Sequence, residues 1–315
     1  MTCRVAILLA VLLMGGTAHA QEENVTMKDE WFETRPVCFG RYVADVPKIL
    51  QPNVSKGRLE EFTITNLGPA SQAELEKKIA DRKALMEAGA EIDDAPKTNY
   101  LSESQDEGIT TLVYERARVI EYFPPVTYDN IETYFRSDDH LFEIKGRIKK
   151  DDRETRLASL FRIAHATRPR DMDEVPEEKG YCLQDAFVAL PDKLDSYVGA
   201  YLRNESVESR FTFNIVVINS ETINEKKYNW PSEARQRVVA GLQGVEAWGT
   251  ENKPYPGSRV YAGEFYGFRP SGNGAQGQSI NIRTTRHYSA PDSPPFSMEV
   301  ATRFWDLVLN SMRLR

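Results

Sequence analysis

The amino-acid sequence predicts an α+β protein built from two similar domains, each an antiparallel sheet with helices packed on it. Three observations lead to this prediction: a cysteine–proline segment that occurs twice, a similar order of strand and helix patterns after each copy, and a charged segment between the halves. The chain has 315 residues, of which 41% are hydrophobic, so it is long enough for two domains with a core each. A single large α+β domain is the alternative.

The repeated segments cover residues 37–47 and 181–191. Each places a cysteine, Cys38 or Cys182, nine residues before a proline, with an alternating apolar stretch between them. The two cysteines are 144 residues apart, which is close to half of the chain. Similarity at this offset favours two similar halves, provided that the elements after each segment also agree.

In the first half, we expect a strand over residues 58–66, which are rich in β-branched and aromatic side chains. A helix should follow, because Ser71 and Glu74 have the spacing of a capping box and apolar residues then repeat at helical intervals. The next three expected strands cover residues 110–122, 130–135 and 140–148. A closing amphipathic helix carries Leu157, Leu160, Phe161 and Ala164 after two aspartates that suit a helix N-terminus.

The second half repeats this order coarsely. A strand is expected over residues 210–219, and a helix is expected to open at Pro231 with Val238, Val239 and Leu242 on one face. The later strands should cover residues 259–268 and 278–288. The closing amphipathic helix carries Val300, Phe304, Leu307, Val308 and Ser311.

The segment between the halves has two prolines, a terminal glycine and alternating charges without apolar periodicity, which is the composition of a linker. We therefore expect an N-terminal domain over residues 21–168, a linker over 169–180 and a C-terminal domain over 181–315.

The first twenty residues have the layout of a cleaved secretory signal peptide. Arg4 precedes an apolar run, and Ala18 and Ala20 supply the small residues of a cleavage site. The apolar run is too short for a membrane anchor, the alternative interpretation. Removal of this segment changes the net charge from −7 to −8, over 295 residues. The acidic balance gives no broad electrostatic footprint for nucleic acid or an anionic membrane.

Patterns for common catalytic and metal sites are absent from the sequence. It contains no HExxH, CxxC, GxSxG or Walker A pattern, so we expect no catalytic residues, metal or cofactor. Gly272, Gly274 and Gly277 match GxGxxG, but an expected strand follows them where a dinucleotide site needs a helix. An exposed loop that contacts a partner is the better interpretation. The acidic clusters lack the spaced ligands of a calcium loop.

Cys38 and Cys182 permit two interpretations. An oxidising compartment allows a disulfide between them if the two repeated segments meet. Each cysteine fits equally well as a small hydrophobic residue in the core of its own domain.

The chain resembles a known family in these same segments. Cys38-Phe-Gly40-Arg41-Tyr42 leading to Pro47, and Gly180-Tyr-Cys182 leading to Pro191, are similar to segments of the lipase-immunity proteins of the type VI secretion system (T6SS). The resemblance implies a two-domain periplasmic protein that binds a secreted phospholipase effector and blocks its access to phospholipid. It implies no catalytic residue and no cofactor.

This resemblance makes a phospholipase effector of the α/β-hydrolase type the expected partner. The acidic charge would steer association with a basic partner surface. Exposed aromatic and Arg side chains dominate binding hot spots, so we expect partner contacts near the glycine-rich loop, from Tyr255, Tyr266, Arg269 and Asn273. The alternatives are a periplasmic ligand-binding or envelope-assembly module without an effector partner, and a hydrolase whose triad has no local signature.

Overall fold

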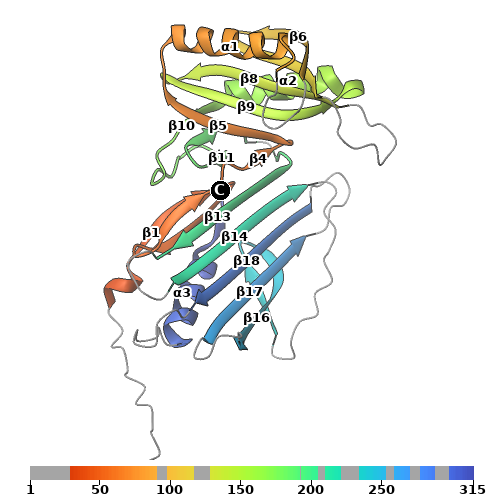
Figure 1. Ribbon diagram of the computed structural model, residues 1–315. Coiled ribbons are helices and arrows are strands. Elements are labelled where there is room, and N and C mark those ends of the chain that lie inside the picture. The colour runs from red at the N-terminus through yellow and green to blue at the C-terminus, as the bar shows by residue number, and fades with distance from the viewer. Residues whose placement is uncertain are drawn as a thin grey trace, which may run out of the picture.

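The computed structural model describes residues 29–90, 98–116, 128–191, 193–204, 210–220, 234–252, 259–269, 277–287 and 298–315. The protein is mostly antiparallel sheet with few helices (Figure 1). Its helices in the described part are η1 (Asp29–Phe32), α1 (Gln72–Glu87), η2 (Lys150–Asp152), α2 (Arg153–His165) and α3 (Met298–Ser311). The expected signal peptide, residues 1–20, lies outside the described residues.

One large sheet of 13 strands runs through both halves of the chain. Its strand order is β15-β16-β17-β18-β14-β13-β4-β5-β9-β8-β7-β6, and β3 also pairs with β13. The first-half strands are β3 (Gln51–Val54), β4 (Arg58–Leu59), β5 (Phe62–Pro69), β6 (Thr98–Asp106), β7 (Ile109–Arg116), β8 (Tyr128–Ser137) and β9 (His140–Lys149). The second-half strands are β13 (Ser196–Arg203), β14 (Arg210–Ser220), β15 (Arg235–Val239), β16 (Leu242–Asn252), β17 (Arg259–Arg269) and β18 (Gly277–His287).

The first-half part of the sheet has a helix on each face. Side chains alternate along β8, so Tyr134 packs with Leu75 and Met86 of α1, while Ile131 lies in the main core together with Leu160 of α2. Ser71 caps α1 through the predicted capping box, with its hydroxyl oxygen accepting from the Glu74 amide.

The second-half part of the sheet has one face against α3. Phe304, Trp305 and Val308 are fully buried there, and the Trp305 ring stacks on Phe213 of β14 at a centroid distance of 6.2 Å. Helix α3 contains the apolar residues of the predicted closing amphipathic helix. The predicted strands over residues 130–135, 140–148, 210–219 and 259–268 are also present, and β18 covers the predicted strand over 278–288 up to His287, because Tyr288 lies outside the described residues.

Two small sheets are formed because the hairpin that opens each half packs on elements of the other half. Strands β1 (Thr34–Phe39) and β2 (Tyr42–Pro47) form a hairpin that pairs with β19 (Arg313–Leu314), and β2 packs against α3. Strands β11 (Tyr181–Cys182) and β12 (Ala186–Val188) pair with β10 (Thr167–Pro169), and β12 packs against β5. Each half therefore opens with a hairpin that lies on elements of the other half.

The prediction of a helix that opens at Pro231 is wrong for its three apolar residues Val238, Val239 and Leu242, whereas Pro231 itself lies outside the described residues. Strands β15 and β16 form a hairpin there, and Ala240 and Gly241 at its turn have positive φ angles of 50° and 78°. Val238 is 59% exposed whereas Val239 is buried, as in a strand that alternates between faces. The apolar residues that suggested a helix face are divided between two strands.

The predicted strand over residues 58–66 is divided into β4 and β5. Glu60 and Glu61 form the turn between these two strands and have positive φ angles of 49° and 71°. Of the predicted strand over 110–122, β7 covers the part up to Arg116, and residues 117–122 lie outside the described residues.

Candidate functional site

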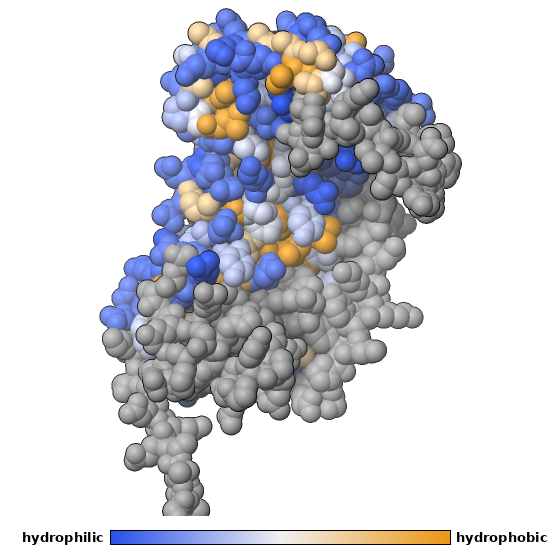
Figure 2. Space-filling model, viewed as in Figure 1, coloured by the Kyte–Doolittle hydropathy of each residue, from blue (hydrophilic) through white to orange (hydrophobic). Residues whose placement is uncertain are grey.

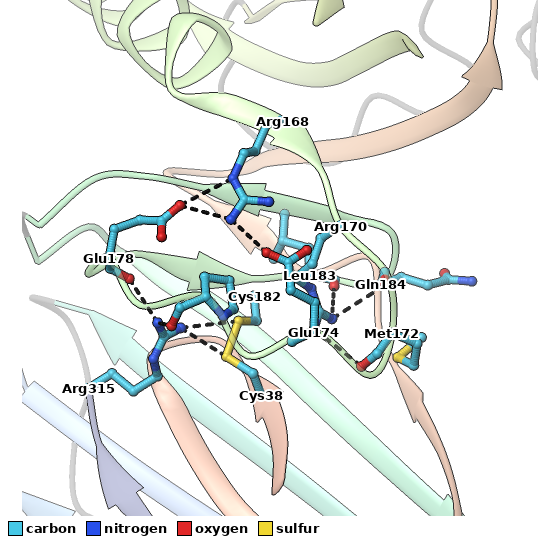
Figure 3. The surroundings of a disulfide bond; sticks show 11 residues. Cys38, Arg168, Arg170, Met172, Glu174, Glu178, Cys182, Leu183, Gln184 and Arg315 are labelled. Atoms are coloured by element: carbon cyan, nitrogen blue, oxygen red, sulfur yellow. Dashed lines mark hydrogen bonds and ion pairs between the residues drawn. A yellow bond between two sulfur atoms is a disulfide. The ribbon is translucent and has the colours of Figure 1, made fainter. Parts of the chain in front are cut away.

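Cys38 and Cys182 lie side by side at the contact between the two exchanged hairpins. A disulfide joins them, with a Cα–Cα distance of 5.7 Å (Figure 3). The backbones beside the bond are paired as well, because the Gly40 amide donates to the Cys182 carbonyl at 2.7 Å and the Cys182 amide donates to the Gly40 carbonyl at 2.8 Å. Both cysteines are fully buried. The bond therefore fastens the opening segment of each half to that of the other.

Three arginines hold the segment between the halves over this bond (Figure 3). Arg170 is 4% exposed and donates to the carbonyls of Glu174 at 2.8 Å and Leu183 at 2.7 Å. Burial lowers the pKa of the Arg170 guanidinium. Arg168 binds Glu178 at 2.8 Å, and Arg315 donates to the sulfur atoms of both cysteines. The expected linker is thus tied to the fold by buried hydrogen bonds.

Among the described residues, no helix covers the face of the large sheet opposite α3 on β13 and β14. Side chains alternate along β13, so Val198, Ala200 and Leu202 point into the core while Tyr197 and Tyr201 are 41% and 40% exposed on the other face. Figure 2 shows hydrophobic residues gathered across the middle of the molecule, at the level of β13 and β14 in Figure 1.

Half-buried apolar side chains of β14 continue this surface. Ile218 pairs with Tyr197, and Val216 pairs with Gly199 in the antiparallel register. Arg58 of β4 pairs with Tyr197 on the other side, and its guanidinium lies over the Tyr197 ring at 5.4 Å. We call this surface, formed by Arg58, Tyr197, Tyr201, Val216 and Ile218, the open sheet face.

A groove of about 600 Å³ adjoins the open sheet face on the first half of the sheet. Arg58 belongs to both surfaces. The groove is lined by residues of β4, β5, β7, β8, β9 and the turn after β4, namely Arg58, Glu61, Thr63, Tyr114, Tyr128, Asn130, Ile131, Lys145, Gly146 and Arg147. It lies on the same face of the sheet as α1, because Tyr114 packs in the cluster that contains Leu75 and Met86 of that helix.

A buried carboxylate supports the floor of this groove. Glu132 of β8 is fully buried and accepts two hydrogen bonds of 2.6 Å from Arg82 of α1. The hydroxyls of Tyr114 and Tyr134 donate to it at 3.1 and 2.7 Å. Burial alone would raise the pKa of Glu132, but the hydrogen bonds from Arg82 and Tyr134 and the nearby cations outweigh burial and lower it. Glu132 therefore holds α1 on the sheet as a carboxylate.

The four residues expected to contact a partner are not brought together on an exposed loop in the described part of the chain. Tyr255 and Asn273 lie outside the described residues. Tyr266 lies within β17 and is only 9% exposed, and Arg269 is the last residue of that strand. Sequence reasoning missed the open sheet face, although the alternation of Tyr197 and Tyr201 with Val198, Ala200 and Leu202 was a usable signal.

A metal site is not found in the part of the chain that the structure describes, where no group of three or more His, Cys, Asp or Glu side chains is placed to hold an ion. None of the described helices has the length and apolar character needed to cross a membrane.

Comparison with known proteins gives one family match and several shared folds. Residues 35–166 match the sequence model of the Tle cognate immunity protein 4 N-terminal domain. Curated protein sequences give no match.

Three solved structures share the fold at low sequence identity. The apo structure of the immunity protein TplEi of the T6SS from Pseudomonas aeruginosa has a TM-score of 0.68 and 18% identity, covering 90% of this chain and 97% of that one. A chain in the crystal structure of the Tle4–Tli4 complex has a TM-score of 0.70 and 17% identity, covering 92% and 99%. TplEi complexed with "L" peptide has a TM-score of 0.64 and 16% identity, covering 90% and 99%. The match over residues 35–166 and the shared fold confirm that the chain is similar to the lipase-immunity proteins of the T6SS.

Proposed function

We propose that this chain is a periplasmic immunity protein that binds a T6SS phospholipase effector and inhibits it by blocking access to phospholipid. The observation that carries the proposal is the match of residues 35–166 to the Tle cognate immunity protein 4 N-terminal domain. A protein with the same fold, at a TM-score of 0.70, occurs in the Tle4–Tli4 complex.

The open sheet face supports a binding role. Sheets of soluble proteins usually carry polar side chains on a solvent face, whereas this one presents two tyrosines and an arginine beside half-buried Val216 and Ile218. Tyr and Arg are enriched at binding hot spots because they combine apolar area with polar groups. We propose that the open sheet face contacts the effector.

The proposed protein acts by binding and not by catalysis. Support comes from the sequence, which has no nucleophile elbow or zinc signature, and from the family match. A periplasmic location is supported by the signal-peptide layout of residues 1–20 and by a disulfide, which persists in oxidising compartments.

We also propose that the chain consists of two similar domains, over residues 21–168 and 181–315, joined by residues 169–180. The family match, which ends at residue 166, supports the first boundary. The similar positions of α2 with β10 and of α3 with β19, each at the end of a half, support the internal similarity. In this proposal the two domains exchange their opening hairpins.

Calorimetric titration with a purified T6SS phospholipase effector, sought in the reading frame next to that of this chain, tests the binding role. We expect a one-to-one complex, weakened by the double substitution Tyr197→Ala/Tyr201→Ala. Leu85→Ala is the matched control, because Leu85 is 44% exposed on α1, away from the open sheet face. Absence of any complex with the unaltered protein contradicts the proposed function. Release of fatty acid from phospholipid by the chain alone contradicts the non-catalytic role.

A further inference from the structure

We infer that the groove beside the open sheet face receives an acidic segment of the partner, with Arg58 and Arg147 as the residues that bind its carboxylates. This inference rests on the proposed function and names the chemistry of the partner at one end of the contact surface. The overall charge of the chain, −7, favours partners with basic surfaces, so the groove would add a local contact of opposite sign.

The two arginines are available for a partner. Both are exposed, and neither forms an ion pair with another described residue. The Arg58 guanidinium lies over the Tyr197 ring at 5.4 Å. Its hydrogen-bond donors have no carboxylate partner among the described residues. Arg147 of β9 lies opposite Asn130 of β8 in the antiparallel register, on the face of the sheet that forms the groove. A planar guanidinium binds a carboxylate through two parallel hydrogen bonds, which gives direction as well as attraction.

The carboxylates near the groove do not neutralise these arginines. Glu132 is buried and is satisfied by Arg82, Tyr114 and Tyr134. Glu132 and Glu143 also form ion pairs with Lys145. The Lys145 Nζ lies 3.9 Å from the Glu132 carboxylate and 3.4 Å from that of Glu143. Glu61, at the turn after β4, is the one carboxylate among the described lining residues. The lining therefore has more cations than anions.

The groove is also shaped for a peptide rather than for a single ion. Its volume of about 600 Å³ is large enough for several side chains, and Tyr128, 39% exposed, adds an aromatic wall. It continues through Arg58 onto the open sheet face, so one partner segment can contact both surfaces. An acidic segment followed by apolar residues has the complementary pattern.

The test is the affinity of the full chain for the purified effector after charge reversal. We expect Arg58→Glu/Arg147→Glu to raise the Kd by about tenfold or more, since like charges would face each other across a desolvated contact. The control is Lys179→Glu/Lys193→Glu, which changes the net charge equally at two exposed lysines outside the groove. We expect the control to change the Kd by less than about threefold. Unchanged circular dichroism and melting temperature would show that both variants fold.

Each outcome separates this inference from the proposed function. If the unaltered chain binds the effector and both double variants bind equally well, the acidic-segment inference is wrong and the proposed function stands. If the unaltered chain does not bind, the proposed function fails first. Vesicles of anionic phospholipid provide a second arm: binding of the chain alone, lost in Arg58→Glu/Arg147→Glu, would assign the groove to lipid and overturn the inference. Arg58→Lys/Arg147→Lys should raise the Kd by less than the charge reversal does, because lysine keeps the positive charge but cannot form the two parallel hydrogen bonds of a guanidinium.

Discussion

Removing the disulfide between Cys38 and Cys182 should destabilise the protein strongly. The bond closes a loop with a sequence separation of 144 residues. The chain-entropy relation for a loop of this length gives about 5 kcal/mol of stabilisation, through restriction of the unfolded chain. Both cysteines are fully buried, so Cys38→Ala/Cys182→Ala avoids the unpaired hydroxyls that serine would introduce. The expected loss in the free energy of unfolding is about 3–5 kcal/mol.

Urea denaturation followed by circular dichroism measures this loss, with the unaltered protein in its oxidised and reduced forms as references. We expect the reduced protein and the double variant to unfold at similar, lower urea concentrations than the oxidised protein. The oxidised protein should contain no free thiol when it is denatured without reductant after signal cleavage. Two reactive thiols under those conditions, or equal stability of all three forms, would refute the role assigned to the bond.

Three further predictions concern other parts of the fold. Glu132→Gln leaves the Arg82 guanidinium without its buried counter-charge, so the free energy of unfolding should fall by about 2–4 kcal/mol in a denaturant titration. The pKa of Glu132 is lowered in the folded state, so its contribution to stability is complete above its ordinary pKa of 4.5 and is lost as the pH falls through the lowered pKa. The difference in stability between Glu132→Gln and the unaltered protein should therefore shrink as the pH falls through this range. A constant difference down to low pH would contradict the role assigned to Glu132. Tyr197→Ala/Tyr201→Ala should raise the Kd for the effector about tenfold or more with little change in melting temperature, and a large thermal shift would instead make these tyrosines structural. Gly241→Ala should lower stability by about 1 kcal/mol, because Gly241 has a φ angle of 78° at the β15–β16 turn; an increase in melting temperature would argue against that turn.

The sequence predicted elements whose signals are local. Ser71 and Glu74 are three residues apart, so the cap of α1 depends on neighbouring residues alone. Strands β8, β9, β17 and β18 carry clear β-branched and aromatic patterns and were predicted close to their observed limits. The error at Val238, Val239 and Leu242 has the same origin: a short apolar run fits a helix face or two strand ends, and the Ala240–Gly241 turn decides between them.

The arrangement that forms the candidate site depends on long-range pairing. Arg58 reaches the open sheet face because the two-residue strand β4 pairs with β13, which is more than one hundred residues away in the sequence. Cys38 meets Cys182 because each opening hairpin packs on the other half. Local patterns contain no information on either contact. The repeated cysteine–proline spacing indicated two related segments, but left their pairing open.

The exchanged hairpins hold the two halves in one position relative to each other. The disulfide, the backbone pair between Gly40 and Cys182, and the buried Arg170 all lie where the halves meet. A binding surface that extends from the groove of the first half to the open sheet face of the second depends on this relation. Preorganisation of that kind lowers the entropic cost of binding.

Inhibition of the effector is the most direct test of the central claim. Hydrolysis of phospholipid vesicles by the purified phospholipase should be measured while the full, oxidised chain is added in increasing amounts. We expect hydrolysis to fall to background at about one equivalent of the chain, and to require a large excess of Tyr197→Ala/Tyr201→Ala for the same effect. Undiminished hydrolysis at excess unaltered chain would contradict the account.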